Sequence, residues 1–209
     1  MIQTENLKYQ YKKGTTIFSF PNIALAKGEN LLILGASGIG KTTLLHLLAG
    51  LLKPVKGSVY IDNVALNTLN SSQLDAFRGK NIGLVFQKKH AIQSLDVFDN
   101  LKARLLFSKT AINKNKIETL LEELGLSNHK KSKINQLSEG QLQRLGIALS
   151  VVHYPQIILA DEPTSSLDDK NCKIVIDLLI DQVKQTNANL IVITHDQRIK
   201  SCFQNSIEL

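Results

Sequence analysis

A glycine-rich loop, GASGIGKT at Gly35 to Thr42, constrains this chain more than any other segment. It lies between a short apolar run, Asn30 to Leu34, and the leucine-rich segment KTTLLHLLAGLL, which predicts a mostly buried helix ending near Lys53 and Pro54. The loop fits the pattern G-x-x-x-x-G-K-S/T in full, and a strand before it with a helix after it is the context that this motif requires. Its glycines let backbone N–H groups and the helix N-terminus converge on phosphate oxygens. The sequence therefore predicts an α/β protein built around a phosphate-binding loop.

This motif gives the residues of the loop separate roles in binding ATP. Lys41 is expected to reach the β and γ phosphates, Thr42 to place its hydroxyl on Mg²⁺, and Thr43 to hydrogen-bond the α-phosphate. The remaining ATP-binding positions are the loop residues whose backbone surrounds the phosphates: Gly35, Ala36, Ser37, Gly38, Ile39 and Gly40.

A second motif, ILADE, lies at the end of an apolar run far along the chain. Ile157 to Ala160 is apolar, so Asp161 and Glu162 are predicted to emerge at the carboxyl end of a strand, where open α/β sheets bind ligands. We expect Asp161 to hold Mg²⁺ through a water, and Glu162 to accept the proton of the water that attacks the γ-phosphate. These two motifs alone fit kinases, GTPases, recombinases and transporter ATPases.

Other short apolar runs, bounded by polar residues or glycine, predict further strands. They lie at Ser58 to Asp62, Ile82 to Phe86, Gln156 to Ala160 and Leu190 to Thr194. Their continuous apolar character indicates a sheet covered on both faces. Between Gln87 and Tyr154 the pattern becomes helical, and the predicted helices are Asp96 to Phe107, Lys114 to Leu124 and Glu139 to Val152. The sequence thus predicts a helical subdomain inserted into an α/β core.

A third motif narrows the function. LSEGQLQR, at Leu137 to Arg144, resembles the signature LSGGQxQR of ABC-type ATPases, and companion motifs follow in the family's order. By this resemblance, Gln87 after the run IGLVF is the Q-loop glutamine, with a catalytic role and a place among the Mg²⁺ ligands. His195 is the switch histidine, and Asp168 in SSLD belongs to the D-loop. Tyr11 resembles the aromatic residue that stacks on adenine, and Tyr9 and Phe18 are the alternative sources of that ring.

The resemblance implies a fold and a dimer. It implies one domain over residues 1–209: a P-loop NTPase core with a mainly parallel sheet, an N-terminal antiparallel β portion and a helical subdomain at about 87–154. It also implies a homodimer around two ATP molecules, in which each signature caps the nucleotide of the other subunit. The signature residues are Ser138, Glu139, Gly140 and Gln141.

One signature position departs from the family. Ser138 and Gly140 lie where a helix begins, so a hydroxyl, N–H groups and the helix dipole converge on an anion. The family usually has glycine where this chain has Glu139. A carboxylate there would repel the γ-phosphate of the other subunit's ATP unless it points outward.

Composition bears on location and partners. No apolar run approaches the roughly 20 residues that span a bilayer, the polar start lacks a secretory signal, and the two cysteines have no metal-site spacing. The net charge of +7 is compatible with nucleic acid, an anionic membrane surface or a phosphate ligand. We expect a cytoplasmic chain, peripheral on the inner face of the cell membrane. Its expected partner is a separate integral membrane permease, and no nucleic acid is expected.

The permease is expected to dock near the Q-loop and the helical subdomain. The candidate contacts are Lys88, Lys89, Ala91, Ile92 and Leu95. The segments FRGKNIGLVFQ and DEPTSSLD resemble the ATPases of the lipoprotein-release, macrolide-export and cell-division group. Two alternatives to a transporter subunit remain: a membrane-coupled mechanical regulator without transport, and a soluble ABC-type ATPase acting on nucleic acid or cofactor assembly.

Overall fold

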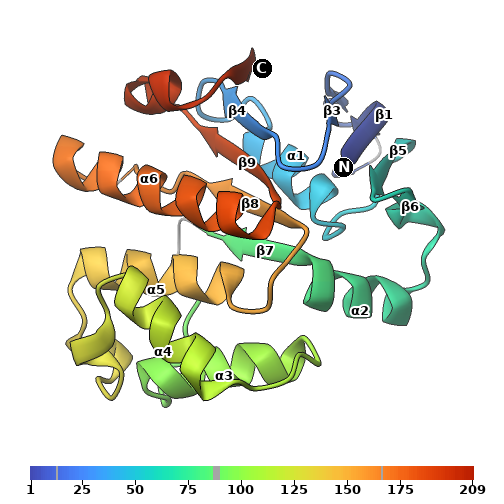
Figure 1. Cartoon of the computed structure of the whole chain (residues 1–209). Coiled ribbons are helices and arrows are strands. Elements are labelled where there is room, and N and C mark those ends of the chain that lie inside the picture. Colours follow the sequence, from blue (N-terminus) through green and yellow to red (C-terminus); the bar gives the residue numbers. More distant parts are fainter. Residues whose placement is uncertain (13, 87–89, 166) are drawn as a thin grey trace.

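A five-stranded parallel sheet forms the centre of the molecule (Figure 1). The computed structural model describes residues 1–12, 14–86, 90–165 and 167–209. The strand order is β10 (Asn205–Glu208), β4 (Asn30–Leu34), β9 (Asn189–Thr194), β8 (Ile157–Asp161), β7 (Ile82–Val85), and each neighbouring pair is parallel. Every residue of β8 and β9 is buried, which is typical of strands covered on both faces. The predicted, mainly parallel sheet is confirmed.

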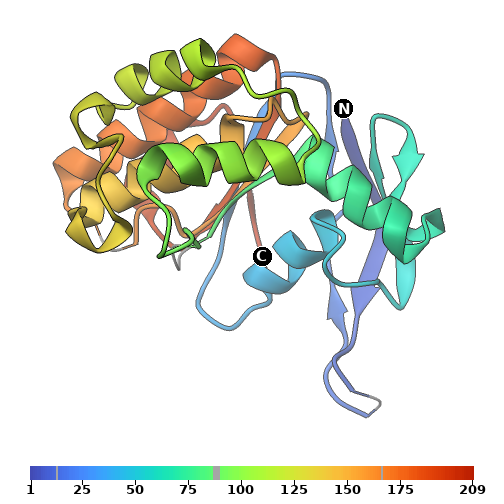
Figure 2. The same cartoon turned by 90° about the horizontal axis from the view of Figure 1, so that it is seen from below.

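The alternation of side chains along the strands divides the interior into two cores. In β4, Leu32 and Leu34 pack into one core, while Leu31 and Ile33 pack into the other. The first core also holds residues of α3 (Val97–Phe107), α4 (Lys114–Glu123), α5 (Glu139–Val151) and α6 (Asp169–Thr186). The second holds α1 (Lys41–Leu48) and the antiparallel sheet. Figure 2 shows α1 on one side of the parallel sheet and α5 and α6 on the other.

The N-terminal region forms the antiparallel sheet that was predicted. Its strands are β1 (Ile2–Tyr9), β2 (Phe18–Ser19), β3 (Ala24–Leu25), β5 (Lys56–Ile61) and β6 (Val64–Ala65), and β1 pairs with β2, β3 and β5. The register of β1 against β5 shifts between Glu5 and Lys8. At this irregularity Gly57 has φ +89°, and a Cβ there would lie 2.2 Å from the carbonyl oxygen of Glu5, so only glycine fits.

The helices between β7 and β8 begin at side-chain caps. Asp96, Asn113 and Ser138 accept hydrogen bonds from the first turns of α3, α4 and α5, and the three helices match their predicted ranges to within one residue at each end. The remaining helix is α2 (Ser71–Asn81), and the short 3-10 turns are Leu66–Thr68, Ser127–His129, Ile134–Gln136 and Gln197–Cys202.

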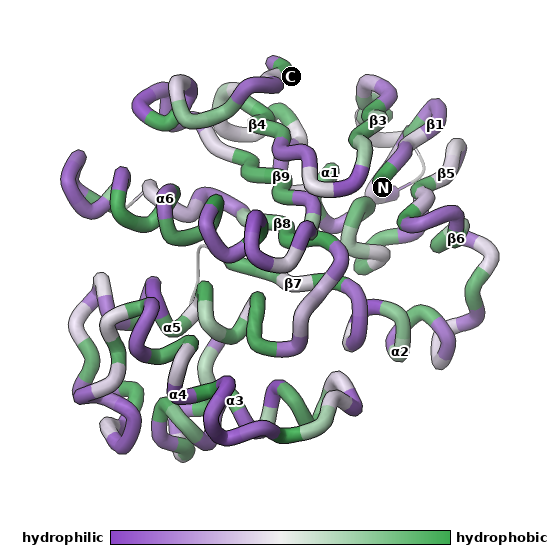
Figure 3. Tube along the Cα trace, viewed as in Figure 1, coloured by the Kyte–Doolittle hydropathy of each residue, from purple (hydrophilic) through white to green (hydrophobic). Residues whose placement is uncertain are grey.

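The helix after the phosphate loop is shorter than predicted. The prediction carried it to the neighbourhood of Lys53, but α1 ends at Leu48, because the chain turns at Gly50, which has φ +64°. Hydropathy along the trace is high in the central strands and mixed in the helices (Figure 3). Among the described residues, no helix combines the length and the apolar character needed to span a bilayer.

Candidate functional site

The carboxyl ends of three neighbouring parallel strands bring the predicted residues together. The glycine-rich loop follows β4, Asp161 and Glu162 end or follow β8, and Thr194 and His195 end or follow β9. Because the strands are parallel, these segments meet at one edge of the sheet. In the loop, Gly40 has φ +109°, and a Cβ there would lie 2.7 Å from the ring of Phe18, so this position excludes a side chain.

The ammonium group of Lys41 is held inside the loop. Its Nζ donates to the carbonyl oxygens of Gly35 (2.8 Å) and Ala36 (3.0 Å) and lies 3.5 Å from Oε1 of Glu162. Only 7% of the lysine side chain is exposed. A nearly buried cation held against a glycine-rich loop, whose backbone N–H groups can also face an anion, is an arrangement that binds phosphate.

Asp161 and Thr42 form a donor set that fits a divalent cation. The hydroxyl of Thr42 donates to Oδ2 of Asp161 (3.0 Å), whereas the buried Oδ1 has no hydrogen-bond partner among the described residues. Burial raises the pKa of the Asp161 carboxyl, and the hydrogen bond from Thr42 opposes that rise. A buried carboxylate oxygen without a partner, beside a hydroxyl, is a donor set that fits Mg²⁺, a cation that prefers oxygen ligands. Gln87, the third predicted ligand, lies outside the described residues.

Glu162 is the most constrained acid of the site. Its Oε2 accepts from the hydroxyl of Thr194 (2.6 Å), and its Oε1 lies 2.9 Å from Nδ1 of His195. Burial disfavours the charged form, but the hydrogen bonds from Thr194 and His195 outweigh it and hold the pKa of Glu162 below its usual value. The residue also has φ +49°, a left-handed conformation that is uncommon outside glycine and clusters at functional sites. Glu162 is therefore ionised and able to accept a proton at neutral pH.

Tyr11 lies beside the start of α1. Its hydroxyl is 2.8 Å from Oγ1 of Thr43, and its ring makes edge contacts with Tyr9 and Phe18. Tyr11 remains 58% exposed, whereas Tyr9 and Phe18 are half-buried. Among these three rings, that of Tyr11 is therefore the most exposed.

The signature residues form the N-terminal end of α5. The hydroxyl of Ser138 accepts from the backbone N–H of Gln141, whose side-chain oxygen accepts from the N–H of Ser138. Gln141 also lies 2.8 Å from the ring of His129, so its side chain stabilises the cap. Glu139 is the exposed first residue of α5. In both Figure 1 and Figure 2 the start of α5 lies apart from α1, so the structure does not bring the signature to the phosphate loop of its own chain.

Sequence reasoning missed a network that joins the segments after Glu162 and His195. Arg198 donates from Nε and Nη2 to the two carboxylate oxygens of Asp196, both at 2.8 Å, and also to Asp169 and the carbonyl of Leu167. Asp196 further accepts from the hydroxyl of Thr164 (2.8 Å). Asp168, the D-loop residue, caps α6 by accepting from the N–H of Asn171. The network thus fixes the loop before α6 to the segment that carries His195.

Replacing Arg198 with Gln is expected to make the fold more sensitive to acid. Hydrogen bonds from Arg198 lower the pKa of the buried Asp196, so Asp196 stabilises the fold above its unfolded-state pKa and loses that contribution as pH falls through its folded-state pKa. Without Arg198 the folded-state pKa rises, and acid unfolding followed by circular dichroism should begin at higher pH. Lys200→Gln, which removes an exposed ion pair with Glu208, is the control and should leave the midpoint unchanged. Coincident curves for R198Q and the parent would contradict this account.

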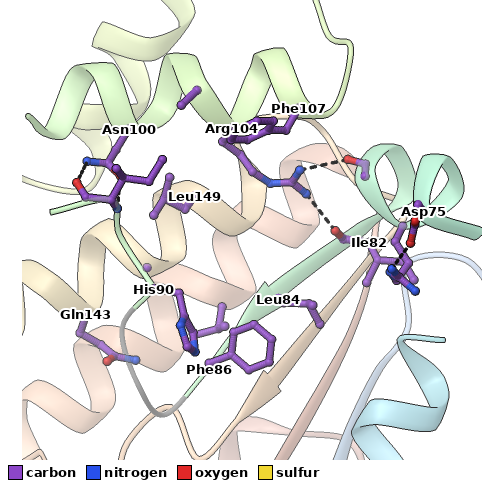
Figure 4. A pocket seen from close by; sticks show the side chains of 16 residues that line it. Asp75, Ile82, Leu84, Phe86, His90, Asn100, Arg104, Phe107, Gln143 and Leu149 are labelled. Atoms are coloured by element: carbon purple, nitrogen blue, oxygen red, sulfur yellow. Dashed lines mark hydrogen bonds and ion pairs between the residues drawn. The ribbon is translucent and has the colours of Figure 1, made fainter. Parts of the chain in front are cut away.

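A cavity of about 410 Å³ lies between α2, β7, α3 and α5 (Figure 4). Arg104 of α3 donates to the carbonyls of Gly79 and Ile82 and to Nε2 of His153. Burial and the neighbouring Arg104 lower the pKa of His153 to about 3, so this imidazole is neutral. Phe107 lines the cavity while 73% exposed.

The cavity partly overlaps the expected docking region. Ile92 lines it and is exposed, whereas Ala91 and Leu95 are half-buried, and Lys88 and Lys89 lie outside the described residues. Sequence reasoning did not single out Phe107 or Arg104, because their place in the cavity depends on how α3 packs against α2.

Comparisons with known proteins agree over almost the whole chain. Residues 20–165 match the family model described as ABC transporter. The lipoprotein-releasing system ATP-binding protein LolD of Legionella pneumophila (strain Lens) is 36% identical over 204 residues, 95% of this chain and 90% of the relative. LolD of Buchnera aphidicola subsp. Schizaphis graminum (strain Sg) is 37% identical over 205 residues, 95% of this chain and 89% of the relative.

Solved structures are also similar. A dimeric post-hydrolysis structure of the ATP-binding cassette MJ0796, bound to ADP and Pi, has a TM-score of 0.89 and 33% identity and covers 100% of this chain and 94% of that chain. The structure of cbiO1 from Clostridium perfringens, part of the ABC transporter complex cbiONQ, has a TM-score of 0.88 and 27% identity, with 99% and 83% covered.

Proposed function

This chain belongs to the ABC transporter family and is the ATP-hydrolysing subunit of such a transporter, and from this premise we propose how its residues act. Glu162 is the general base, Lys41 binds the β and γ phosphates, and Tyr11 stacks on adenine. The observation that carries the proposal is the geometry of the Glu162 carboxylate, which Thr194 and His195 hold 3.5 Å from Nζ of Lys41.

Each of these site residues has a separate role in ATP hydrolysis. Before ATP binds, two carbonyl oxygens of the loop already hold the ammonium group of Lys41 in place and partly desolvated. When ATP enters, phosphate oxygens replace these carbonyls as hydrogen-bond acceptors. Thr42 and Asp161 would hold Mg²⁺, which would supply positive charge to neutralise the phosphates. Glu162 orients the attacking water and accepts its proton. His195 keeps the carboxylate of Glu162 in place by its contact at 2.9 Å.

Two copies of the chain are proposed to close around two ATP molecules. The signature lies apart from the phosphate loop of its own chain, and the related cassette MJ0796 is dimeric with ADP and Pi. At the start of α5, a Cβ added to Gly140 would meet no described atom outside its own helix turn and chain neighbours within 4 Å, which supports a role for this position in contacting a second molecule. Each signature then supplies Ser138 and the N-terminal N–H groups of α5 to the partner's nucleotide.

Replacing Glu139 with Gly is expected to tighten this dimer. Two like charges about 4 Å apart repel by roughly 4 kcal/mol at an effective dielectric of about 20, which gives the scale of the opposition to closure at close range. In a Glu162→Gln background, which retains ATP, E139G should dimerise at lower ATP concentration in sedimentation experiments. Added salt should narrow the difference if the carboxylate is partly solvated. Coincident titration curves at low salt would show that Glu139 does not oppose closure.

A separate membrane permease is the proposed partner, and it places the chain on the inner face of the membrane. The docking surface is the cavity between α2, α3 and α5, whose lining combines apolar residues with Arg104 and Asp75. Since the curated relatives are ATP-binding proteins of lipoprotein-releasing systems, a permease of that type is the first candidate. Co-purification with that permease, and loss of the complex when Ala103 at the cavity is changed to Glu, would support the assignment. A complex that survives A103E would place the docking surface elsewhere.

A further inference from the structure

The turn between α3 and α4 exposes apolar and basic side chains together. Leu106 and Phe107, at the end of α3, are 63% and 73% exposed, and Ile112 in the following turn is exposed as well. The lysines of this segment, also exposed, are Lys109, Lys114 and Lys116. We call these six residues the α3–α4 patch. Soluble proteins scatter single exposed apolar residues, but three exposed apolar residues in one short segment that also exposes three lysines are a combination typical of surfaces that enter a lipid headgroup layer.

No carboxylate among the described residues neutralises the charges of the α3–α4 patch. Residues 105–117 include no Asp or Glu. Within the part of the chain that the structure describes, no carboxylate lies within ion-pair distance of the three lysines. Two acids close by are occupied, since Asp75 pairs with Arg78 and Glu118 pairs with Lys130. Lys116 instead lies 5.0 Å from the ring centre of Tyr154. The patch therefore presents unpaired positive charge to its surroundings.

The patch adjoins the proposed docking surface. Phe107 lines the cavity between α2, α3 and α5, and its backbone oxygen lies near Gly79 at the end of α2. Figure 2, seen from below, shows α3, the turn after it and α2 on the side toward the viewer, so these backbone segments lie side by side. A permease in that cavity would bring the patch toward the bilayer.

We propose that the α3–α4 patch binds the anionic headgroup surface of the membrane, with Leu106, Phe107 and Ile112 entering the interface and the lysines contacting lipid phosphates. The orientation of the patch rests on the proposed function, but binding to lipid does not require the permease. Each lysine near an anionic surface strengthens binding about fivefold, and the exposed aromatic ring adds apolar contact. An acidic segment of the permease is the competing occupant of the same surface.

The test uses the complete chain and vesicles without permease. The sequence has no tryptophan, so F107W introduces a single fluorescent reporter. Vesicles containing phosphatidylglycerol should shift its emission to shorter wavelength, and lipids brominated on their acyl chains should quench it. Neutral phosphatidylcholine vesicles should produce neither change. I174W, on exposed Ile174 of α6, is the control and should not respond.

Two triple lysine variants with the same net charge distinguish binding by the α3–α4 patch from a general effect of the protein's positive charge. Replacing Lys109, Lys114 and Lys116 with Gln should weaken sedimentation with anionic vesicles by at least about tenfold. The matched control replaces Lys27, Lys56 and Lys173, which are exposed on other parts of the chain and give the same net charge. The control should bind as the parent does, and ATPase activity should be unchanged in both triple variants. Equal binding by both would overturn the proposal.

A second result would also overturn it. If the parent fails to bind anionic vesicles while the patch variants lose only their association with purified permease, the surface contacts protein instead of lipid. Failure of the permease assignment would give a different result, because vesicle binding would persist while co-purification fails.

Discussion

Replacing Glu162 with Gln is expected to lower the rate of ATP hydrolysis by roughly 10² to 10⁴ while ATP remains bound. The amide keeps the shape of the carboxylate but cannot accept the proton of the attacking water. Because hydrogen bonds from Thr194 and His195 already hold the pKa of Glu162 below its usual value, the parent has its base ionised at neutral pH. Single-turnover phosphate release, measured beside ATP affinity, separates the loss of chemistry from a loss of binding.

The matched control for E162Q is Glu208→Gln, an equivalent change at an exposed position on the edge strand β10. It should hydrolyse ATP at the parent's rate. Hydrolysis at the parent's rate by E162Q itself would mean that another group accepts the proton. The rate of the parent should also fall in acid as pH drops through the folded-state pKa of Glu162, because only the ionised form accepts a proton.

Replacing Lys41 with Ala is expected to weaken ATP binding by about 10- to 100-fold and to lower turnover as well. Hydrogen bonds made by charged groups contribute about 1.5 to 3 kcal/mol, and this ammonium is nearly buried where the phosphates would lie. The change also removes the cation 3.5 Å from Glu162. Calorimetric titration with ATP measures the affinity, and magnesium dependence of the residual activity should persist.

Lys173→Ala, on the exposed side of α6, is the control for K41A and should bind ATP as the parent does. Thermal unfolding without nucleotide should be compared as well, since Lys41 also satisfies the carbonyls of Gly35 and Ala36. Unchanged ATP affinity in K41A would contradict the assignment of the phosphate loop.

The centre of the site was predictable because each of its motifs directly follows one strand in the sequence. The loop from Gly35 to Thr42 needs a strand and a helix around it, and both follow from apolar runs in the sequence. The same holds for Asp161 and Glu162 after β8. Their meeting at one edge then follows from the parallel order of the strands.

Other parts of the fold were not predicted from the sequence. No residue of α2 is fully buried, and only Leu74 and Phe77 pack against the core from its inner side, so its apolar pattern is too short to have predicted it. In α6, by contrast, Val175, Leu179 and Val183 recur at helical spacing after the cap at Asp168, a signal that sequence analysis missed. The contacts of Arg198 with Leu167 and Asp169 span about thirty positions and depend on the packed fold, so periodicity could not reveal them.

The central claim, a nucleotide-dependent dimer with a site completed across subunits, is tested most directly by one measurement on E162Q. Sedimentation at saturating ATP and Mg²⁺, with bound nucleotide quantified in the same fractions, should give a dimer that carries two ATP molecules and dissociates when ADP replaces ATP. A monomer that carries one ATP at every protein concentration would contradict the account.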